Sequence, residues 1–220
     1  MDTQSQEIQR ISTIYDRMAP TWDARQRAME RRLMGGDALR RSLAHWLHGD
    51  VLEIGSGTGA TIPFVEFGSD KVTSFTATDI SSGMLERART IAAGNDRIHF
   101  ALMPADSLAF PDASFDTVTC SLVLCSVPDP VKALQEMSRV CKPGGRIILL
   151  EHVRAHNRLI ALIQKIVTPL QARMIGCHFD RPTDQILRDL GFAVEREERR
   201  FFDIFVLLVA RNTALAANRS

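Results

Sequence analysis

The sequence predicts an α/β fold: a seven-stranded, mostly parallel sheet with an antiparallel last strand, covered by helices on both faces. From residue 51 onward, strand-like apolar segments alternate with helix-like segments, which is the pattern of a parallel sheet. Residues 147–150 are apolar at every position, as expected for a strand buried on both sides. The chain also ends in two strand-like segments with no helix between them, which predicts a hairpin at one edge.

Residues 1–48 are predicted to form a helical cover in front of the sheet domain. Ile8, Ile11 and Ile14 recur at helical spacing. We expect interruptions at Ala19-Pro20 and at Gly35-Gly36. Asp37 is the predicted N-cap of a second helix. The apolar side of that helix is formed by Leu39, Leu43, Trp46 and Leu47.

The sheet domain is predicted to span residues 49–212. Its expected strands are residues 51–54, 73–78, 98–103, 116–124 and 146–150. The helices between them are expected at residues 60–67, 84–93 and 129–141. Pro128 and Pro130 mark the start of the last of these helices, where a missing backbone N–H costs little.

Residues 155–176 break this alternation because they form a long apolar helix where a short connector is the rule. We expect Pro169 to interrupt it. We interpret residues 155–182 as a lid over the substrate, with ordinary packing at the sheet edge as the alternative. A helix at 182–190 and two strands at 193–197 and 202–210, joined by a tight turn near Arg199-Arg200, complete the prediction. Residues 213–220 are read as a frayed tail.

Composition narrows the class of protein. The chain has 220 residues, 45% of them hydrophobic and 24% charged, with a net charge of +1. This balance gives no argument for a nucleic-acid partner. Arginines crowd residues 25–41, which we interpret as a solvated helical face, with contact to an anionic membrane surface as the alternative. They are Arg25, Arg27, Arg31, Arg32, Arg40 and Arg41.

The four cysteines do not form a C-x-x-C pair, so the sequence predicts neither a metal site nor a disulfide framework. Free thiols fit a reducing compartment. The N-terminal segment lacks the apolar run of a signal peptide, and no apolar stretch has the length of a membrane span. We therefore expect a cytoplasmic protein, with peripheral membrane contact as an open option.

The most informative motif is the loop Glu53-Ile-Gly55-Ser-Gly57-Thr-Gly59, which follows one predicted strand and precedes a predicted helix. Glycines allow a sharp turn and a close approach of the backbone to a ligand. The spacing Gly55-x-Gly57-x-x-Ala60, with Asp79 about 20 residues further on, also satisfies the dinucleotide-binding pattern. Glu53 argues against that alternative, because a carboxylate there attracts an ammonium group and repels a pyrophosphate.

Together these stretches resemble the class I methyltransferases that use S-adenosylmethionine (SAM). The resemblance covers about residues 12–210 and includes the Rossmann-like fold. Besides the glycine loop, it rests on Tyr15-Asp16, Ala19 and Trp22-Asp23, on Thr78-Asp79-Ile80-Ser81 with Met84, on FPDASFDTV at 110–118 and on KPGG at 142–145.

The resemblance implies a role for particular residues in binding SAM, whose product is S-adenosylhomocysteine. Gly55, Gly57 and Gly59 would pass the methionyl part, and Glu53 would face its ammonium. Asp79 would hold both ribose hydroxyls. The remaining cofactor-binding positions are Ile80 and Met84 on the adenine, Ser121 and Leu122 beside the methionine, and Tyr15 and Trp22 as a cover.

One position departs from the family pattern. The aspartate that commonly bonds the adenine amino group aligns with Pro104 here. Either Asp106 or the backbone around Ala105 is expected to replace it.

The segments SLVLCSVPDP at 121–130, LEHVR at 150–154 and GCHFDRPT at 176–183 resemble one branch of the family. That branch contains methyltransferase-like thiol S-methyltransferases and bacterial phosphatidylethanolamine N-methyltransferases. It implies a small, apolar or amphipathic acceptor. Thiol S-methylation ranks first, phosphatidylethanolamine N-methylation second, and O- or C-methylation of a quinone or secondary metabolite third. A nicotinamide-dependent oxidoreductase and a non-catalytic SAM-binding protein remain as alternatives from other classes.

Three residues are candidates for contact with the acceptor or for catalysis. His152 follows the fifth strand, at the end of the sheet where ligands bind in such folds, and an imidazole can act as a base near neutral pH. His178 lies in a predicted loop between two helices. Tyr15 is the only tyrosine. Cys125 is interpreted as a core residue.

Overall fold

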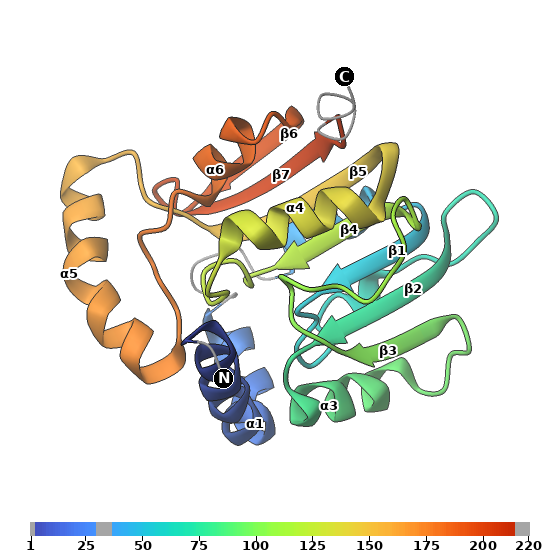
Figure 1. Cartoon of the computed structure of the whole chain (residues 1–220), viewed down its shortest axis with the longest axis horizontal. Coiled ribbons are helices and arrows are strands. Elements are labelled where there is room, and N and C mark those ends of the chain that lie inside the picture. Colours follow the sequence, from blue (N-terminus) through green and yellow to red (C-terminus); the bar gives the residue numbers. More distant parts are fainter. Residues whose placement is uncertain (1–2, 30–36, 214–220) are drawn as a thin grey trace.

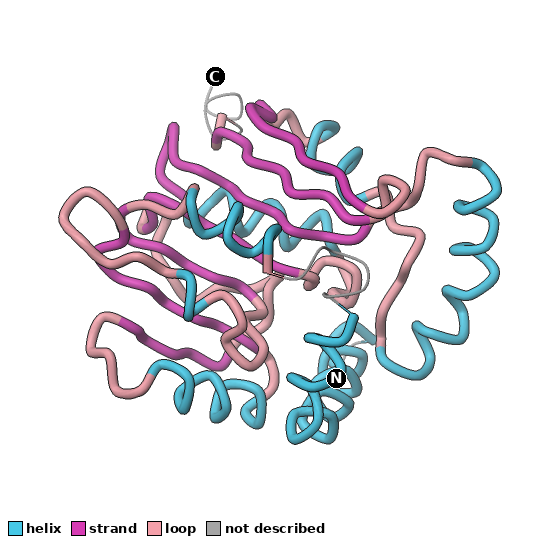
Figure 2. The backbone as a smooth tube through the Cα atoms, turned by 180° about the vertical axis from the view of Figure 1, so that it is seen from behind, coloured by secondary structure: helices cyan, strands magenta, loops and turns pink. Residues whose placement is uncertain are grey.

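A computed structural model of the chain describes residues 3–29 and 37–213. Its centre is a seven-stranded sheet with the strand order β3-β2-β1-β4-β5-β7-β6 (Figures 1 and 2). The strands are β1 (Gly49–Ile54), β2 (Val72–Asp79), β3 (Ile98–Leu102), β4 (Phe115–Ser121), β5 (Cys141–His152), β6 (Ala193–Arg200) and β7 (Phe205–Arg211).

The first five strands are parallel, and β7 runs antiparallel to both β5 and β6. The predicted sheet, including its antiparallel last strand, is therefore confirmed. The strand order reverses between β1 and β4, which lie side by side although β2 and β3 intervene in the chain. In open parallel sheets a ligand crevice lies outside the carboxyl ends of the strands at such a switch point.

Helices cover both faces of the sheet, and each face has its own apolar core. Several helix starts are encoded locally: the Ser81 hydroxyl accepts from the Met84 N–H, and the Asp129 carboxylate accepts from the Lys132 N–H. The helices are α1 (Thr3–Met29), α2 (Ala38–His45), α3 (Ser82–Ala92), α4 (Pro130–Val140), α5 (Arg158–Ile175) and α6 (Thr183–Asp189).

The N-terminal cover differs from its prediction in two respects. Helix α1 runs unbroken through Ala19-Pro20, so the expected interruption there is wrong. Pro20 removes one hydrogen bond within the helix, but polar contacts on both sides of it bind the helix to the sheet domain, through Asp16 and Asp23. Asp37 precedes α2 without a side-chain cap. The expected break at Gly35-Gly36 lies outside the described residues, as do Arg31, Arg32 and residues 214–220 of the tail.

The helix predicted at 60–67 is also wrong. Only one short 3-10 helix, Ile62–Phe64, follows the glycine loop. In a helix over residues 60–67, Pro63 would lie past the first turn position and have no backbone N–H to donate, and the segment instead leads into a turn before β2. The loop thus passes from β1 to β2 without a full crossover helix.

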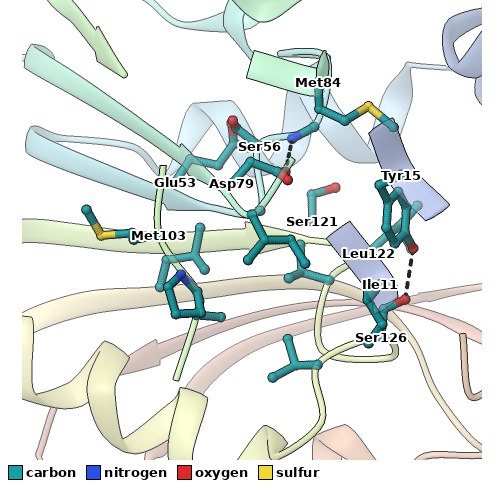
Figure 3. Close-up of a pocket in the computed structure, with 18 of the residues that line it drawn as sticks. Ile11, Tyr15, Glu53, Ser56, Asp79, Met84, Met103, Ser121, Leu122 and Ser126 are labelled. Carbon is teal, nitrogen blue, oxygen red and sulfur yellow. Dashed lines mark hydrogen bonds between the residues drawn. The ribbon is translucent and has the colours of Figure 1, made fainter. Parts of the chain in front are cut away.

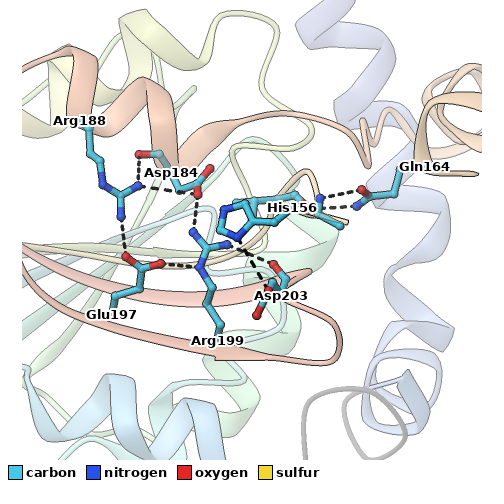
Figure 4. A network of polar contacts seen from close by, with 9 residues as sticks. His156, Gln164, Asp184, Arg188, Glu197, Arg199 and Asp203 are labelled. Atoms are coloured by element: carbon cyan, nitrogen blue, oxygen red, sulfur yellow. Dashed lines mark hydrogen bonds and ion pairs between the residues drawn. The ribbon is translucent and has the colours of Figure 1, made fainter. Parts of the chain in front are cut away.

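The C-terminal third contains two further corrections. Pro169 lies inside an unbroken α5, so the predicted interruption is absent. Arg199 and Arg200 belong to β6, and the turn to β7 is formed instead by Phe201, Phe202 and Asp203, all in left-handed backbone conformations. An ion-pair network then fixes α6 to this hairpin: Arg199 binds Asp184 and Glu197, and Arg188 binds the same two carboxylates (Figure 4).

Helix α5 stands at the edge of the molecule beside α1, away from the sheet (Figure 1). Its inward face carries Ala161, Gln164 and Thr168, while its large apolar side chains point outward. The Gln164 amide anchors it by bonds to the backbone of Val153, Ala155 and Phe179. None of the described helices is both long and apolar enough to cross a lipid bilayer.

Candidate active site

A cavity of about 880 Å³, measured with its open mouth, lies at the carboxyl ends of β1, β2 and β4. Helix α1 forms the opposite wall. Figure 3 shows Glu53, Ser56 and Asp79 on one side, Met103 at one end, and Ile11, Tyr15 and Ser126 at the other. The cavity therefore occupies the switch point of the sheet.

The glycine loop turns sharply at the floor of this cavity. Gly55 and Gly57 have φ values of +60° and +55°, where an L side chain is strained. At Gly55 a Cβ would also lie 2.5 Å from the Val123 side chain. At Gly57 the nearest heavy atom to a Cβ is Trp22 Nε1 at 4.0 Å, so that position is open to the cavity. Gly57 thus allows a ligand to approach the backbone.

Asp79 ends β2 beside this loop. One of its carboxylate oxygens accepts from the Gly57 N–H at 2.9 Å, and the other accepts from the Ser81 N–H at 2.9 Å. Burial raises the pKa of Asp79 to about 6, although these backbone bonds act in the opposite direction. Each oxygen retains a lone pair, so the carboxylate can receive two hydroxyl groups from a ligand.

Glu53 and Arg40 are two further charged residues of the cavity wall. Both are buried, with exposed fractions of 1% and 3%. Burial raises the pKa of Glu53 to about 7, against the opposing effects of Thr61 and Arg40. Glu53 Oε2 is buried without a hydrogen-bond partner. Arg40 donates to Thr61 Oγ1 and Ser121 Oγ. An orphaned carboxylate oxygen beside a buried guanidinium matches a ligand that carries an ammonium and a carboxylate.

Helix α1 is bound to the cavity rim by a row of polar contacts. The Asp16 carboxylate accepts from Ser81 Oγ and from the Gly83 N–H. Asp23 accepts from Thr58 Oγ1 in the glycine loop at 2.5 Å and pairs with Arg87. These bonds hold Tyr15 and Trp22, whose rings meet edge to face, over the cavity.

The end near β3 is formed by Met103, Pro104, Ala105 and Asp106. Gln4 of α1 donates a hydrogen bond to the buried carboxylate of Asp106. Both alternatives for the missing adenine ligand, Asp106 and the backbone around Ala105, therefore line the cavity.

The opposite end is largely apolar. It contains Ile11, Tyr15 and Ser126 (Figure 3), and the cavity has further apolar lining residues in Ile8, Val127 and Pro128. The polar groups there are the Tyr15 and Ser126 hydroxyls, which bond to each other at 2.9 Å. Burial is the main cause that raises the pKa of Tyr15 well above its usual value, so the phenol is neutral at physiological pH.

The two histidine candidates lie behind this end. His152 is buried at the end of β5, with Nε2 3.2 Å from the Cys177 sulfur, and is not among the residues that line the cavity. His178 lies in the predicted loop between α5 and α6, where burial and Arg181 lower its pKa; it is also not a lining residue. Their catalytic roles stay predictions, as does the lid role of α5, which contributes no lining residue.

Most residues predicted to bind the cofactor meet in this one cavity. The exception is Gly59, which packs against Ile62 and Ala88. The sequence analysis did not predict that Ile8, Ile11, Arg40 and Ser126 line the cavity. It had assigned Arg40 to a solvated helical face. The signal for Arg40 was present, because position 40 lies one turn before Leu43 on the buried side of α2.

Comparison with known proteins agrees with this geometry. The methyltransferase-domain family matches residues 52–149. A demethylmenaquinone methyltransferase of Clavibacter sepedonicus is 33% identical over 76% of this chain and 69% of its own. A phosphatidylethanolamine N-methyltransferase of Cereibacter sphaeroides is 33% identical over 68% and 74%. The rat thiol S-methyltransferase TMT1B is 35% identical over 60% and 55%.

Among solved structures, a SAM-dependent methyltransferase from Thermotoga maritima superposes with a TM-score of 0.65 at 21% identity, over 91% of this chain and 99% of its own, which supports the fold. The chain therefore belongs to the class I SAM-dependent methyltransferases, and its cofactor is S-adenosylmethionine. The orphaned oxygen of Glu53, the open face of Gly57 and the acidic end of β2 fit that cofactor.

Proposed function

We propose that this methyltransferase transfers the methyl group of SAM to the sulfur of a small apolar thiol. The observation that carries the proposal is the apolar end of the cavity, where the described lining residues supply two neutral hydroxyls and no charged group. The bound cofactor supplies an activated methyl group on a sulfonium. The chain's own residues orient the two reactants and exclude water.

In this proposal, the charged wall and the Met103 end of the cavity bind the cofactor, and the end with Tyr15 and Ser126 binds the acceptor. Glu53 would receive the ammonium of the methionyl part and Arg40 its carboxylate, since both charges are buried at the same wall. Asp79 would hold the ribose hydroxyls, and the Met103 end would take the adenine. This orientation directs the sulfonium toward Tyr15 and Ser126, where the acceptor would lie.

A thiol fits this end on chemical grounds. Its pKa of about 8.5 leaves a few per cent of the reactive thiolate at neutral pH, so a strong base is not required. A protonated amine must lose a more tightly held proton before it can react. A buried ammonium or phosphate would also need an opposite charge that this end does not provide.

Phosphatidylethanolamine N-methylation is the second candidate because of α5. Seven large apolar side chains on this helix are exposed by 37% to 69%: Leu159, Leu162, Ile163, Ile166, Val167, Leu170 and Met174. Arg154, Arg158 and Lys165 line a depression at its N-terminal end. An exposed apolar face with basic neighbours suits the interface of an anionic membrane.

We infer that α5 attaches the protein to a membrane surface from the cytoplasmic side, where its four free cysteines stay reduced. This attachment is compatible with either acceptor, because apolar thiols also partition into lipid. The lid role of residues 155–182 would then describe a helix that lies on the membrane beside the cavity entrance.

Methyl transfer from isotope-labelled SAM tests the proposal. An alkanethiol, the alkanol of equal chain length and phosphatidylethanolamine in micelles would be offered in parallel. We expect label on the thiol and none on the alkanol. Label on the lipid alone would favour the second candidate. Label on none would overturn thiol methylation and favour a quinone or secondary metabolite.

A further inference from the structure

Three buried side chains with metal-binding atoms meet behind the acceptor end of the cavity. They are Cys125 after β4, His152 at the end of β5 and Cys177 after α5. One ligand atom from each, two sulfurs and an imidazole nitrogen, lies within 4.8 Å of the others. We refer to these three residues as the Cys-His-Cys cluster.

The fold holds the cluster together through three separate connections. Strands β4 and β5 are parallel neighbours, so the segments after them emerge side by side. The returning chain is attached by the His178 N–H, which donates to the Cys125 carbonyl at 2.9 Å. Arg181 adds bonds to the carbonyls of Leu124 and Val127. The donors therefore come from different parts of the chain and are oriented by backbone contacts.

The two sulfurs and one imidazole nitrogen favour particular metal ions. Thiolate and imidazole ligands suit Zn²⁺ and other soft or borderline cations, whereas Mg²⁺ and Ca²⁺ require oxygen ligands. Two thiolates balance the charge of a divalent ion in a buried place. Tetrahedral zinc bonds of about 2.0–2.3 Å place neighbouring donors roughly 3.5–4 Å apart, a spacing compatible with the observed cluster after small rotamer changes.

The imidazole of His152 presents its Nε2 atom to the sulfurs of the cluster. Its ring is fixed between Phe179 and Phe205. One ring nitrogen faces a thiol, which is a weak hydrogen-bond partner, and the other, Nδ1, is buried without any partner. Such an imidazole is costly to bury. A metal bond at Nε2 would replace the weak contact with the thiol, and the ring proton would then lie on Nδ1.

We propose that Cys125, His152 and Cys177 bind one divalent cation of the Zn²⁺ class. Three protein ligands leave a fourth tetrahedral position, as in catalytic rather than structural zinc sites. The cluster borders the acceptor end, since the Cys125 sulfur lies 3.6 Å from the Ser126 hydroxyl that bonds Tyr15. Binding of the cation does not depend on which acceptor is methylated.

Titration of the reduced full-length protein with Co²⁺ tests this site without measuring activity. We expect one equivalent to produce thiolate-to-cobalt charge-transfer absorption and intense tetrahedral d–d bands, and one equivalent of Zn²⁺ to remove them. Loss of a residue that only supports a metal ligand typically weakens metal binding by roughly 10–100-fold. Cys177→Ser removes a ligand itself and should weaken cobalt binding by at least this factor. Cys141→Ser, which alters another buried cysteine outside the cluster, should bind as the wild type does.

His152→Gln gives a second variant, and thermal unfolding would verify that each variant is folded. Loss of the bands in His152→Gln and Cys177→Ser, with retention in Cys141→Ser, supports the site. Absence of thiolate bands in the reduced wild type would overturn it. Equal loss in Cys141→Ser would overturn it as well, because the cation would then be bound elsewhere.

Discussion

The carboxylate of Asp79 accepts a hydrogen bond from the Gly57 N–H at 2.9 Å, so the end of β2 supports the loop that follows β1. The acidic residue that we expect to hold the ribose therefore also fixes the backbone of the glycine loop. Cofactor binding and the shape of the glycine loop are therefore coupled through one side chain.

Gly57→Ala should separate backbone strain from ligand contact. We expect unfolding to become easier by about 1–2 kcal/mol, because the left-handed conformation strains an alanine. SAM affinity should fall as well, since the added methyl group faces the cavity. Gly94→Ala is the matched control: Gly94 has φ +76° and nothing within 4 Å of a Cβ. It should show a similar loss of stability with normal SAM affinity, and a parallel loss of affinity would refute the contact at Gly57.

SAM affinity should depend on pH through Glu53. Its pKa of about 7 means that the unliganded site is largely protonated under mildly acidic conditions, where the ammonium of SAM loses its partner. Affinity should therefore rise between about pH 5.5 and pH 7.5, with release of a proton on binding. Calorimetry in buffers of different ionisation enthalpy measures that proton. Glu53→Gln should bind more weakly near neutral pH and lose the dependence around pH 7; an unchanged profile would exclude Glu53.

The outward face of α5 should mediate membrane attachment. We expect the double variant Leu162→Ser/Ile166→Ser to bind less to vesicles of phosphatidylcholine and phosphatidylserine in a sedimentation assay, because it loses apolar contact area. Leu102→Ser alters an equally exposed leucine at the other edge of the sheet and should bind normally. If wild type and double variant sediment alike, the helix has another role.

The network around Arg199 should contribute measurably to stability. Its side chain is only 13% exposed and pairs with Asp184, which is 10% exposed. Arg199→Ala should lower the free energy of unfolding by about 1–3 kcal/mol, because it leaves a nearly buried carboxylate with fewer partners. Arg196→Ala removes a pair on the same strand whose arginine is 57% exposed, and should cost less than about 1 kcal/mol. Urea denaturation that finds equal effects would contradict this reasoning.

The sheet and the cofactor wall could be predicted because their signals are local. A glycine loop after a strand and Asp79 after the next strand specify both the turn and the ligand chemistry within the sequence itself. The prolines were misjudged because the contacts that keep α1 helical through Pro20 come from residues more than 30 positions away, such as Thr58 and Ser81. Helix propensity depends on neighbouring residues in the sequence and does not include such tertiary contacts.

The Cys-His-Cys cluster could not be predicted for a related reason. Its members are 25 to 52 positions apart and show none of the close spacings of zinc motifs. They meet only because β4 and β5 are neighbours and the chain returns past Cys125 after α5. Likewise, α5 reads as an apolar helix in sequence, but only the fold reveals that its apolar face points outward.

Calorimetric titration of SAM into the wild type and Asp79→Ala tests the assignment of the cavity most directly. We predict that the variant remains folded and binds SAM more weakly by roughly 1.5–3 kcal/mol, the scale of lost hydrogen bonds to a charged group. Unchanged affinity in the folded variant would contradict the placement of the cofactor between Asp79 and Glu53.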